Sequence, residues 1–170
     1  MSFPAAVGQI PVYYNHFNTG RPTATDGAGN WYSRYRDIPN EPLFPFGYGL
    51  SYTDFSYENL TLNKEKLQKG QSLTVSVDVK NTGVQDGKEV VQLYIRDITA
   101  SVIRPVKELK GFEKIFLEGG AAKKVSFTLT GKDLSFYNES GDLVLEPGRF
   151  EVFVGSNSRD ALSRGFELTE

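Results

Sequence analysis

The sequence contains no cysteine and only one histidine among its 170 residues. The lack of cysteine excludes disulfides, thiolate zinc sites and cysteine nucleophiles, and a single histidine excludes a histidine-rich metal site. The formal net charge of -2 gives no electrostatic footprint for nucleic acid or an anionic membrane surface. No apolar run approaches the roughly 18 residues of a membrane span, and the opening Met1–Pro4 does not resemble a signal peptide. We expect no nucleic-acid partner, no membrane insertion, no cofactor and no metal.

The first third of the chain differs in composition from the rest. Thirteen of the 22 aromatic residues and six of the eight prolines precede residue 58, so this part is rich in side chains suited to packing against another surface. Only Gln9–Asn15 shows the apolar alternation of a strand here. The segment Arg21–Pro42 is rich in Gly, Thr, Asn and Asp without periodicity, which indicates an irregular loop or linker.

From about Phe55 the pattern becomes that of short strands. Apolar residues at every second position of Leu73–Val79 predict a half-buried strand, and Val91 to Ile95 predict the next, with Gln92 and Arg96 facing outward. The only helix candidate, Asn63–Gln68, is too short to organise a core. About seven or eight strands with frequent turn signals predict an all-β sandwich of two antiparallel sheets. Further strands are expected at Leu109–Leu117, Val125–Leu129, Phe150–Val154 and Gly165–Thr169, with short segments at Leu134–Phe136 and Leu143–Leu145.

No acidic pair stands out as catalytic machinery. A glycosidase needs two placed carboxylates, whereas the aspartates at strand ends, outward positions and turns indicate solvated surface charge. These are Asp54, Asp78, Asp86, Asp97 and Asp142. The Gly47–Gly49 segment lacks the third glycine and the strand-to-helix context of a dinucleotide loop, and it indicates a tight backbone approach instead. We expect no catalytic residue in this chain.

A few aromatic and basic residues could contact a saccharide. His16 has no nucleophile elbow of the Gly-x-Ser-x-Gly type to serve, which favours a structural or substrate-edge role over that of a base. The aromatic and arginine mixture around residues 31–36 suits a sugar ring, but it also suits packing against a neighbouring domain, which we favour. The possible substrate-edge residues are His16, Trp31, Tyr32, Arg34 and Tyr35.

Several distinctive strings follow one another in a fixed order along nearly the whole chain: Gly8–His16, Pro45–Thr53, Val79–Gly83, Gly87–Tyr94, Arg104–Phe112 and Glu146–Phe150. Together they resemble the C-terminal end of family 3 glycoside hydrolases of the periplasmic β-glucosidase type. One departure is the turn at Glu118–Ala121, where that family usually has a Pro-Gly-Glu-type turn.

The resemblance implies three parts: residues 1–20 as the terminal strand of a truncated α/β sandwich domain, 21–54 as a linker, and 55–170 as a fibronectin type III-like, immunoglobulin-like β-sandwich. In that family the catalytic aspartate lies in a barrel and the acid/base in the α/β domain, and no residue here matches either motif. The chain would then be a non-catalytic accessory fragment whose partners are those two domains, in a periplasmic or secreted enzyme.

Two other functions stay open at this point. A carbohydrate-binding module would need exposed aromatics on one face, for which Tyr94, Phe116 and Phe153 are the candidates outside the linker. A free-standing protein-interaction sandwich is compatible with the fold alone. If the leading aromatic segment lacks its neighbour, we expect it to be mobile or to pair with a second copy of the chain.

Overall fold

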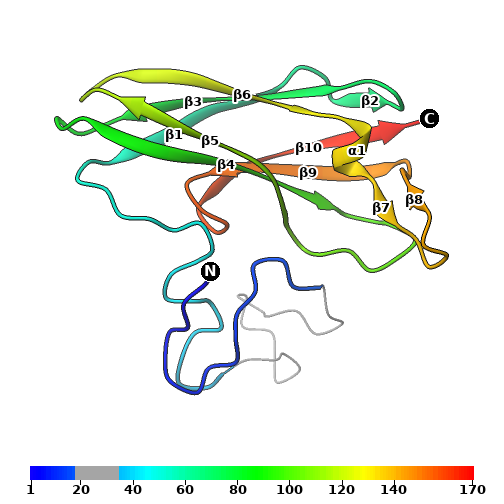
Figure 1. The fold of residues 1–170 in the computed structure, drawn as a ribbon, viewed down its shortest axis with the longest axis horizontal. Helices are drawn as coiled ribbons and strands as arrows, with labels where there is room; N and C mark the ends of the chain where they lie inside the picture. Colours follow the sequence, from blue (N-terminus) through cyan, green and yellow to red (C-terminus); the bar gives the residue numbers. More distant parts are fainter. Residues whose placement is uncertain (18–34) are drawn as a thin grey trace.

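The computed structural model describes residues 1–17 and 35–170, in which two β-sheets pack face to face above a leading segment that hangs below them (Figure 1). A four-residue helix and a small hairpin lie at one end of the sandwich. The elements are β1 (Phe55–Leu62), β2 (Lys66–Gln68), β3 (Leu73–Asn81), β4 (Gly87–Asp97), β5 (Glu108–Leu117), β6 (Ala122–Leu129), α1 (Gly131–Leu134), β7 (Phe136–Tyr137), β8 (Leu143–Val144), β9 (Gly148–Gly155) and β10 (Ala161–Thr169).

The predicted all-β sandwich is confirmed. One sheet has the strand order β1-β3-β6 and the other β2-β10-β9-β4-β5, while β7 and β8 pair with each other. Neighbouring strands are antiparallel, except that the short β2 runs parallel to β10. The described helix α1 is far too short to cross a membrane.

The core forms where the apolar faces of the two sheets meet. In β3 the buried positions alternate with half-buried ones, as the sequence pattern predicts for a strand with one face inward. Each such side chain contributes about 1.5 to 3 kcal/mol through its removal from water. The most completely buried core residues include Leu73, Val75, Val77 and Val79 of β3, Val91 and Leu93 of β4, and Phe150, Val152 and Val154 of β9.

Three local predictions are wrong. Asn63–Gln68 is not a helix: its last three residues form β2, and Leu67 alone among them enters the core. Gln9–Asn15 forms no strand, because no described strand pairs with it. The last strand begins at Ala161, four residues before the predicted start at Gly165.

Strand β1 was not predicted because its pattern is interrupted. Asn59 adopts the left-handed region with φ 53°, and the register with β3 shifts between Glu58 and Thr61. Strand β5 carries a bulge next to Gly111, since Gly111 pairs with Leu93 and the register then shifts before Tyr94.

Candidate functional site

The leading arm, defined here as residues 1–17 and 35–54, lies against the outer face of the five-stranded sheet (Figure 1). Tyr14 stacks on Phe46 with ring centroids 4.3 Å apart, and meets Tyr94 of β4 edge-on at 5.6 Å. Tyr94 is therefore fully buried, and burial raises the pKa of its hydroxyl. The prediction that Tyr94 is an exposed sugar-stacking residue is wrong.

Gln92 provides a second attachment for the arm. Its side-chain amide donates hydrogen bonds to the carbonyls of Gly47 at 3.0 Å and Ser156 at 2.5 Å, and its oxygen accepts one from Tyr94. Gln92 faces away from the core, as predicted, but it is only 4% exposed because the arm covers it. The tight approach expected at Gly47 is present, because a Cβ there would collide with the Gln92 amide and φ is +83°.

Contacts between its two pieces also stabilise the arm itself. The side chain of Gln9 is nearly buried and donates to the carbonyls of Pro39 and Asn40, both at 3.2 Å. A backbone bridge joins Phe3 to Phe44, whose rings meet edge-on. These contacts within the arm therefore hold its two pieces in one arrangement.

Lys107, in the loop between β4 and β5, lies over the ring of Phe153. Its ammonium lies 4.0 Å from the Phe153 ring centroid and donates to the carbonyl of Ser158 at 2.6 Å. Burial lowers the pKa of Lys107, and Glu151 partly offsets this. Because the Lys107 ammonium lies over the Phe153 ring, this ring, which was predicted to stack on a sugar, is already covered.

Phe116 is the one predicted sugar-stacking residue outside the linker that the structure leaves open to solvent. It points outward from β5 together with Phe112, which the sequence analysis missed because the alternation in this strand is loose. Both are more than half exposed, at 55% for Phe116 and 68% for Phe112.

His16 and Tyr35, two of the five possible substrate-edge residues, line the same hollow of about 490 Å³ in the arm. The Tyr35 hydroxyl accepts a hydrogen bond of 2.7 Å from the backbone N–H of Ile10, which fixes one wall. The other three predicted residues, Trp31, Tyr32 and Arg34, lie outside the described residues. The remaining described lining consists of Ile10, Pro11, Val12, Tyr13 and Asn40.

The described lining of this hollow is mostly apolar and aromatic, which suits contact with another surface. Its described lining contains no acidic side chain, and a ring nitrogen of His16 lies 3.0 Å from the carbonyl oxygen of Phe17. The carbonyl of His16 accepts a hydrogen bond from the Val106 N–H at 2.9 Å, which ties this end of the arm to the β4–β5 loop. An acid–base role would need an orienting carboxylate, which the described lining lacks.

Large apolar side chains of the arm remain exposed to solvent. Ile10 is 72% exposed and Tyr13 65% exposed, although both stand beside well-packed neighbours. Exposed apolar side chains gathered in one segment in this number indicate an interaction surface. The exposed apolar residues of the arm include Phe3, Val7, Ile10, Tyr13, Phe17, Leu43, Leu50 and Tyr52.

The described residues offer no obvious metal site. No group of three or more His, Asp or Glu side chains within residues 1–17 and 35–170 comes close enough to hold a metal ion. Four of the five aspartates assigned to the surface are half-buried or exposed, but Asp97 is only 8% exposed, so for this residue the assignment is wrong.

Comparison with known proteins places these features in context. The family described as the fibronectin type III-like domain matches residues 89–158. A periplasmic beta-glucosidase of Salmonella typhimurium is 49% identical over 168 residues, which is 99% of this chain and 22% of that protein. A putative beta-xylosidase of Formosa agariphila is 42% identical over 168 residues, or 99% of this chain and 21% of that protein.

The solved structures agree with the sequence comparison. A beta-glucosidase from Listeria innocua in complex with glucose superimposes with a TM-score of 0.92 at 50% identity, over 100% of this chain and 24% of that one. The chain therefore spans less than a quarter of the length of these relatives, and its resemblance to them extends through the arm as well as the sandwich.

Proposed function

This chain carries a fibronectin type III-like domain and is homologous along its whole length to family 3 β-glucosidases, and from this we propose that it is the non-catalytic accessory part of such an enzyme. The parent protein would hydrolyse O-glycosidic bonds with groups located in its barrel and α/β domains. The observation that carries the proposal is the exposed apolar surface of the arm on a chain that spans only about a fifth of its relatives.

The domain division that we propose has residues 1–20 as the end of the α/β domain, 21–54 as the linker and 55–170 as the sandwich. The start of β1 at Phe55 supports the last boundary. The parent would work in the periplasm or outside the cell, as the name of the Salmonella relative suggests.

The arm would connect the sandwich to a second domain, with one side bound to each. Its inner side is fastened to the sheet by Tyr14, Phe46 and the Gln92–Gly47 hydrogen bond, which together give it one orientation. Its outer side presents Ile10 and Tyr13, whose burial against a second domain would supply hydrophobic free energy. Because the arm is already held against the sheet before it binds, it loses less conformational entropy on docking than a flexible tail would.

The same surface would bring the substrate-edge residues to the border of the active site. His16 and Tyr35 share one hollow, and we propose that the substrate-edge role extends to Trp31, Tyr32 and Arg34, which lie outside the described residues. Aromatic faces and arginine donors suit the apolar and hydroxylated sides of a sugar ring, so these residues would contribute contact without chemistry.

A reconstitution experiment tests the accessory role. The purified chain is titrated into the Salmonella β-glucosidase from which the matching C-terminal segment has been removed, and binding is followed by calorimetry. We expect a saturable complex and a loss of at least tenfold in affinity for a Tyr13→Ala, Phe17→Ala double variant, since both residues are exposed on the arm.

The matched control replaces an equally exposed aromatic outside the arm. Tyr137→Ala on β7 removes a ring that is 69% exposed on the hairpin and should leave the affinity unchanged. No detectable complex with the truncated enzyme, or an equal loss for Tyr137→Ala, would contradict docking through the arm. Sedimentation of the chain alone shows whether a second copy occupies the same surface.

A further inference from the structure

Strand β5 forms one edge of the five-stranded sheet, and the outward face of its second half is open to solvent. Phe112, Lys114 and Phe116 occupy every second position there, and all three are exposed. Alternate residues of a strand point to the same side of the sheet, so these three side chains share one face. The two rings therefore stand on the sandwich itself, away from both the core and the arm.

The pairing of β5 with β4 adds a second row to this face. Lys88 lies directly opposite Phe116, and Val90 lies directly opposite Lys114. Directly opposite residues of an antiparallel pair have Cβ atoms about 4.5 to 5.5 Å apart, so the two rows are neighbours. Lys88 is exposed and Val90 is half-buried. We call these residues, Lys88, Val90, Phe112, Lys114 and Phe116, the β5 platform.

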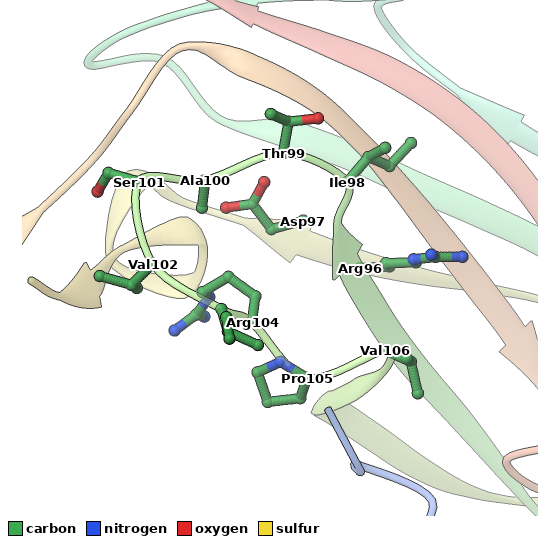
Figure 2. A pocket seen from close by; sticks show the side chains of 11 residues that line it. Arg96, Asp97, Ile98, Thr99, Ala100, Ser101, Val102, Arg104, Pro105 and Val106 are labelled. Carbon is green, nitrogen blue, oxygen red and sulfur yellow. The ribbon is translucent and has the colours of Figure 1, made fainter. Parts of the chain in front are cut away.

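The arm borders the platform at the Phe112 end. Gln92, the β4 partner of Phe112, is covered by Gly47 of the arm. Beyond this point β4 continues to Asp97, where the chain leaves the strand and loops back toward β5 (Figure 2). The open face is thus confined to the stretch of the β4–β5 pair on the other side of the arm.

The platform carries positive charge. In the part of the chain that the structure describes, the ammonium groups of Lys88 and Lys114 have neither an ion-pair nor a hydrogen-bond partner. The one acid within this stretch of β5, Glu113, points to the other side, where its carboxylate pairs with a lysine of β6 at 3.2 Å. The acids of the adjoining turns, Asp86 and Glu118, lie beyond the ends of both strands.

These features favour an acidic saccharide over other partners. An aromatic ring offers a flat apolar face to the C–H side of a sugar ring, and a lysine ammonium attracts a carboxylate. A protein partner would have to desolvate the two lysines between and beside the rings, and lysine is depleted in protein interfaces for this reason. Two lysines are also too few to hold the chain on an anionic membrane, where clusters of about four to eight are usual.

The spacing indicates a chain of sugar rings. Four residues along a strand cover about 13 Å, so Phe112 and Phe116 stand farther apart than one sugar ring can reach. A saccharide chain that follows the strand would meet Phe112, then Lys114, then Phe116, with Lys88 beside the last ring.

We propose that the β5 platform binds an acidic oligosaccharide, with Phe112 and Phe116 stacking on its rings and Lys88 and Lys114 pairing with its carboxylates. The platform includes no residue of the arm, so this binding does not depend on the proposed accessory role. In the proposed parent enzyme it would attach the sandwich to a uronate-bearing polysaccharide while hydrolysis takes place in the other domains.

Calorimetry on the whole chain at low ionic strength tests the proposal. The chain is titrated separately with a galacturonate oligosaccharide, a neutral xylose oligosaccharide of the same length, and polyglutamate, which has carboxylates but no rings. We expect saturable binding of the galacturonate, at least tenfold tighter than that of either comparison ligand and weakened by added salt.

The other outcomes of this titration would each overturn the proposal. An absence of galacturonate binding would remove the site altogether. Equal affinity for polyglutamate would show attraction by charge alone, and equal affinity for the neutral oligosaccharide would show that the lysines select nothing. Equally tight binding to vesicles of anionic phospholipid would assign the surface to a membrane.

Variants then locate the binding on the platform. Phe116→Ala and Lys114→Gln should each weaken the galacturonate complex about fivefold, because one removes a stacking face and the other a positive charge. The matched controls are Tyr137→Ala on β7 and Lys132→Gln on α1, which remove an exposed ring and an exposed charge elsewhere. Equal losses in the controls, or unchanged affinity in both platform variants, would contradict the assignment.

Nuclear magnetic resonance of the unaltered chain gives a measurement that requires no variant. The ¹⁵N-labelled protein is titrated with the same galacturonate oligosaccharide. We expect saturable shifts at the amides of residues 112–116 of β5 and of Lys88 on β4. Shifts confined to the arm would place the ligand on a different surface and would refute the site.

Discussion

The side-chain amide of Gln92 donates a hydrogen bond to the backbone carbonyl of Gly47 across 3.0 Å. One residue belongs to strand β4 and the other to the arm, so this contact joins the two parts of the molecule. Gln92 is almost fully buried there and also bonds to Ser156 and Tyr94. The orientation of the arm therefore depends on a hydrogen-bonded group within the sheet as well as on aromatic packing.

Gly47→Ala should weaken this attachment. The added Cβ would collide with the Gln92 amide, and alanine is strained at φ +83°, so we expect a loss of about 1 to 3 kcal/mol in the free energy of unfolding. Urea denaturation followed by fluorescence measures it. Gly49→Ala is the matched control, since it has open space and no positive φ, and it should change stability by less than about 0.5 kcal/mol.

Tyr14→Ala should release the arm from the sheet. The substitution removes the stacking on Phe46 and the edge contact with Tyr94, and we expect a loss of about 1 to 3 kcal/mol together with faster proteolysis of the arm. The neighbouring Tyr13→Ala is the control, because that ring is 65% exposed. Equal protection from protease in Tyr14→Ala and the unaltered chain would show that the arm is seated by other contacts.

A hydrogen bond between the two sheets yields a third prediction. The Tyr57 hydroxyl donates to Glu89 at 2.6 Å, and burial raises the pKa of both groups. Tyr57→Phe leaves the half-buried carboxylate without this donor and should cost about 1 to 2 kcal/mol at pH 7. In the Tyr57→Phe, Glu89→Gln double variant the loss should be smaller than the sum of the two single losses, because the pair is coupled.

The pH dependence of stability should reveal Asp97. Burial raises the pKa of its carboxyl from its usual value near 3.8 to about 6, although Arg104 lowers it, while Glu146 and Glu108 raise it. Between these values the folded chain holds a proton that the unfolded chain has lost, so this residue makes stability fall as the pH rises from about 4 to 6. Above that window its ionisation should cost about 1 to 3 kcal/mol.

Asp97→Asn isolates this effect. The variant should be more stable than the unaltered chain at pH 7, and the difference should vanish near pH 4. Chemical denaturation of both proteins at several pH values measures it, with the exposed Asp142→Asn as the reference. A stability difference that does not change between pH 4 and 7 would contradict the raised pKa.

The sequence was sufficient to predict the strands in which local pattern and burial agree. The alternation through Leu73–Val79 places one face of β3 in the core, and the resemblance to family 3 glycoside hydrolases agrees with the comparisons. Strand β1 escaped prediction because Asn59 and the adjacent register shift interrupt its period. Asn63–Gln68 was misread since β2 owes its strand conformation to parallel pairing with the distant β10.

The site could be predicted only in part because its burial is non-local. Gln92 and Tyr94 occupy the face of β4 opposite the core, and local alternation assigns that face to solvent. Tyr14 and Gly47 of the arm return to cover it, together with Ser156 and Lys107. Asp97 was likewise assigned to the surface because nothing in its neighbourhood shows that the following loop folds over it.

The absence of catalysis by this chain is the central claim, and turnover of an aryl β-glucoside tests it most directly. The chain is purified through successive orthogonal steps, and the rate per mole is measured after each one. We predict that any initial rate falls to the uncatalysed background as purification proceeds. A rate per mole that stays constant through every step would contradict the account and would place catalytic groups within these 170 residues.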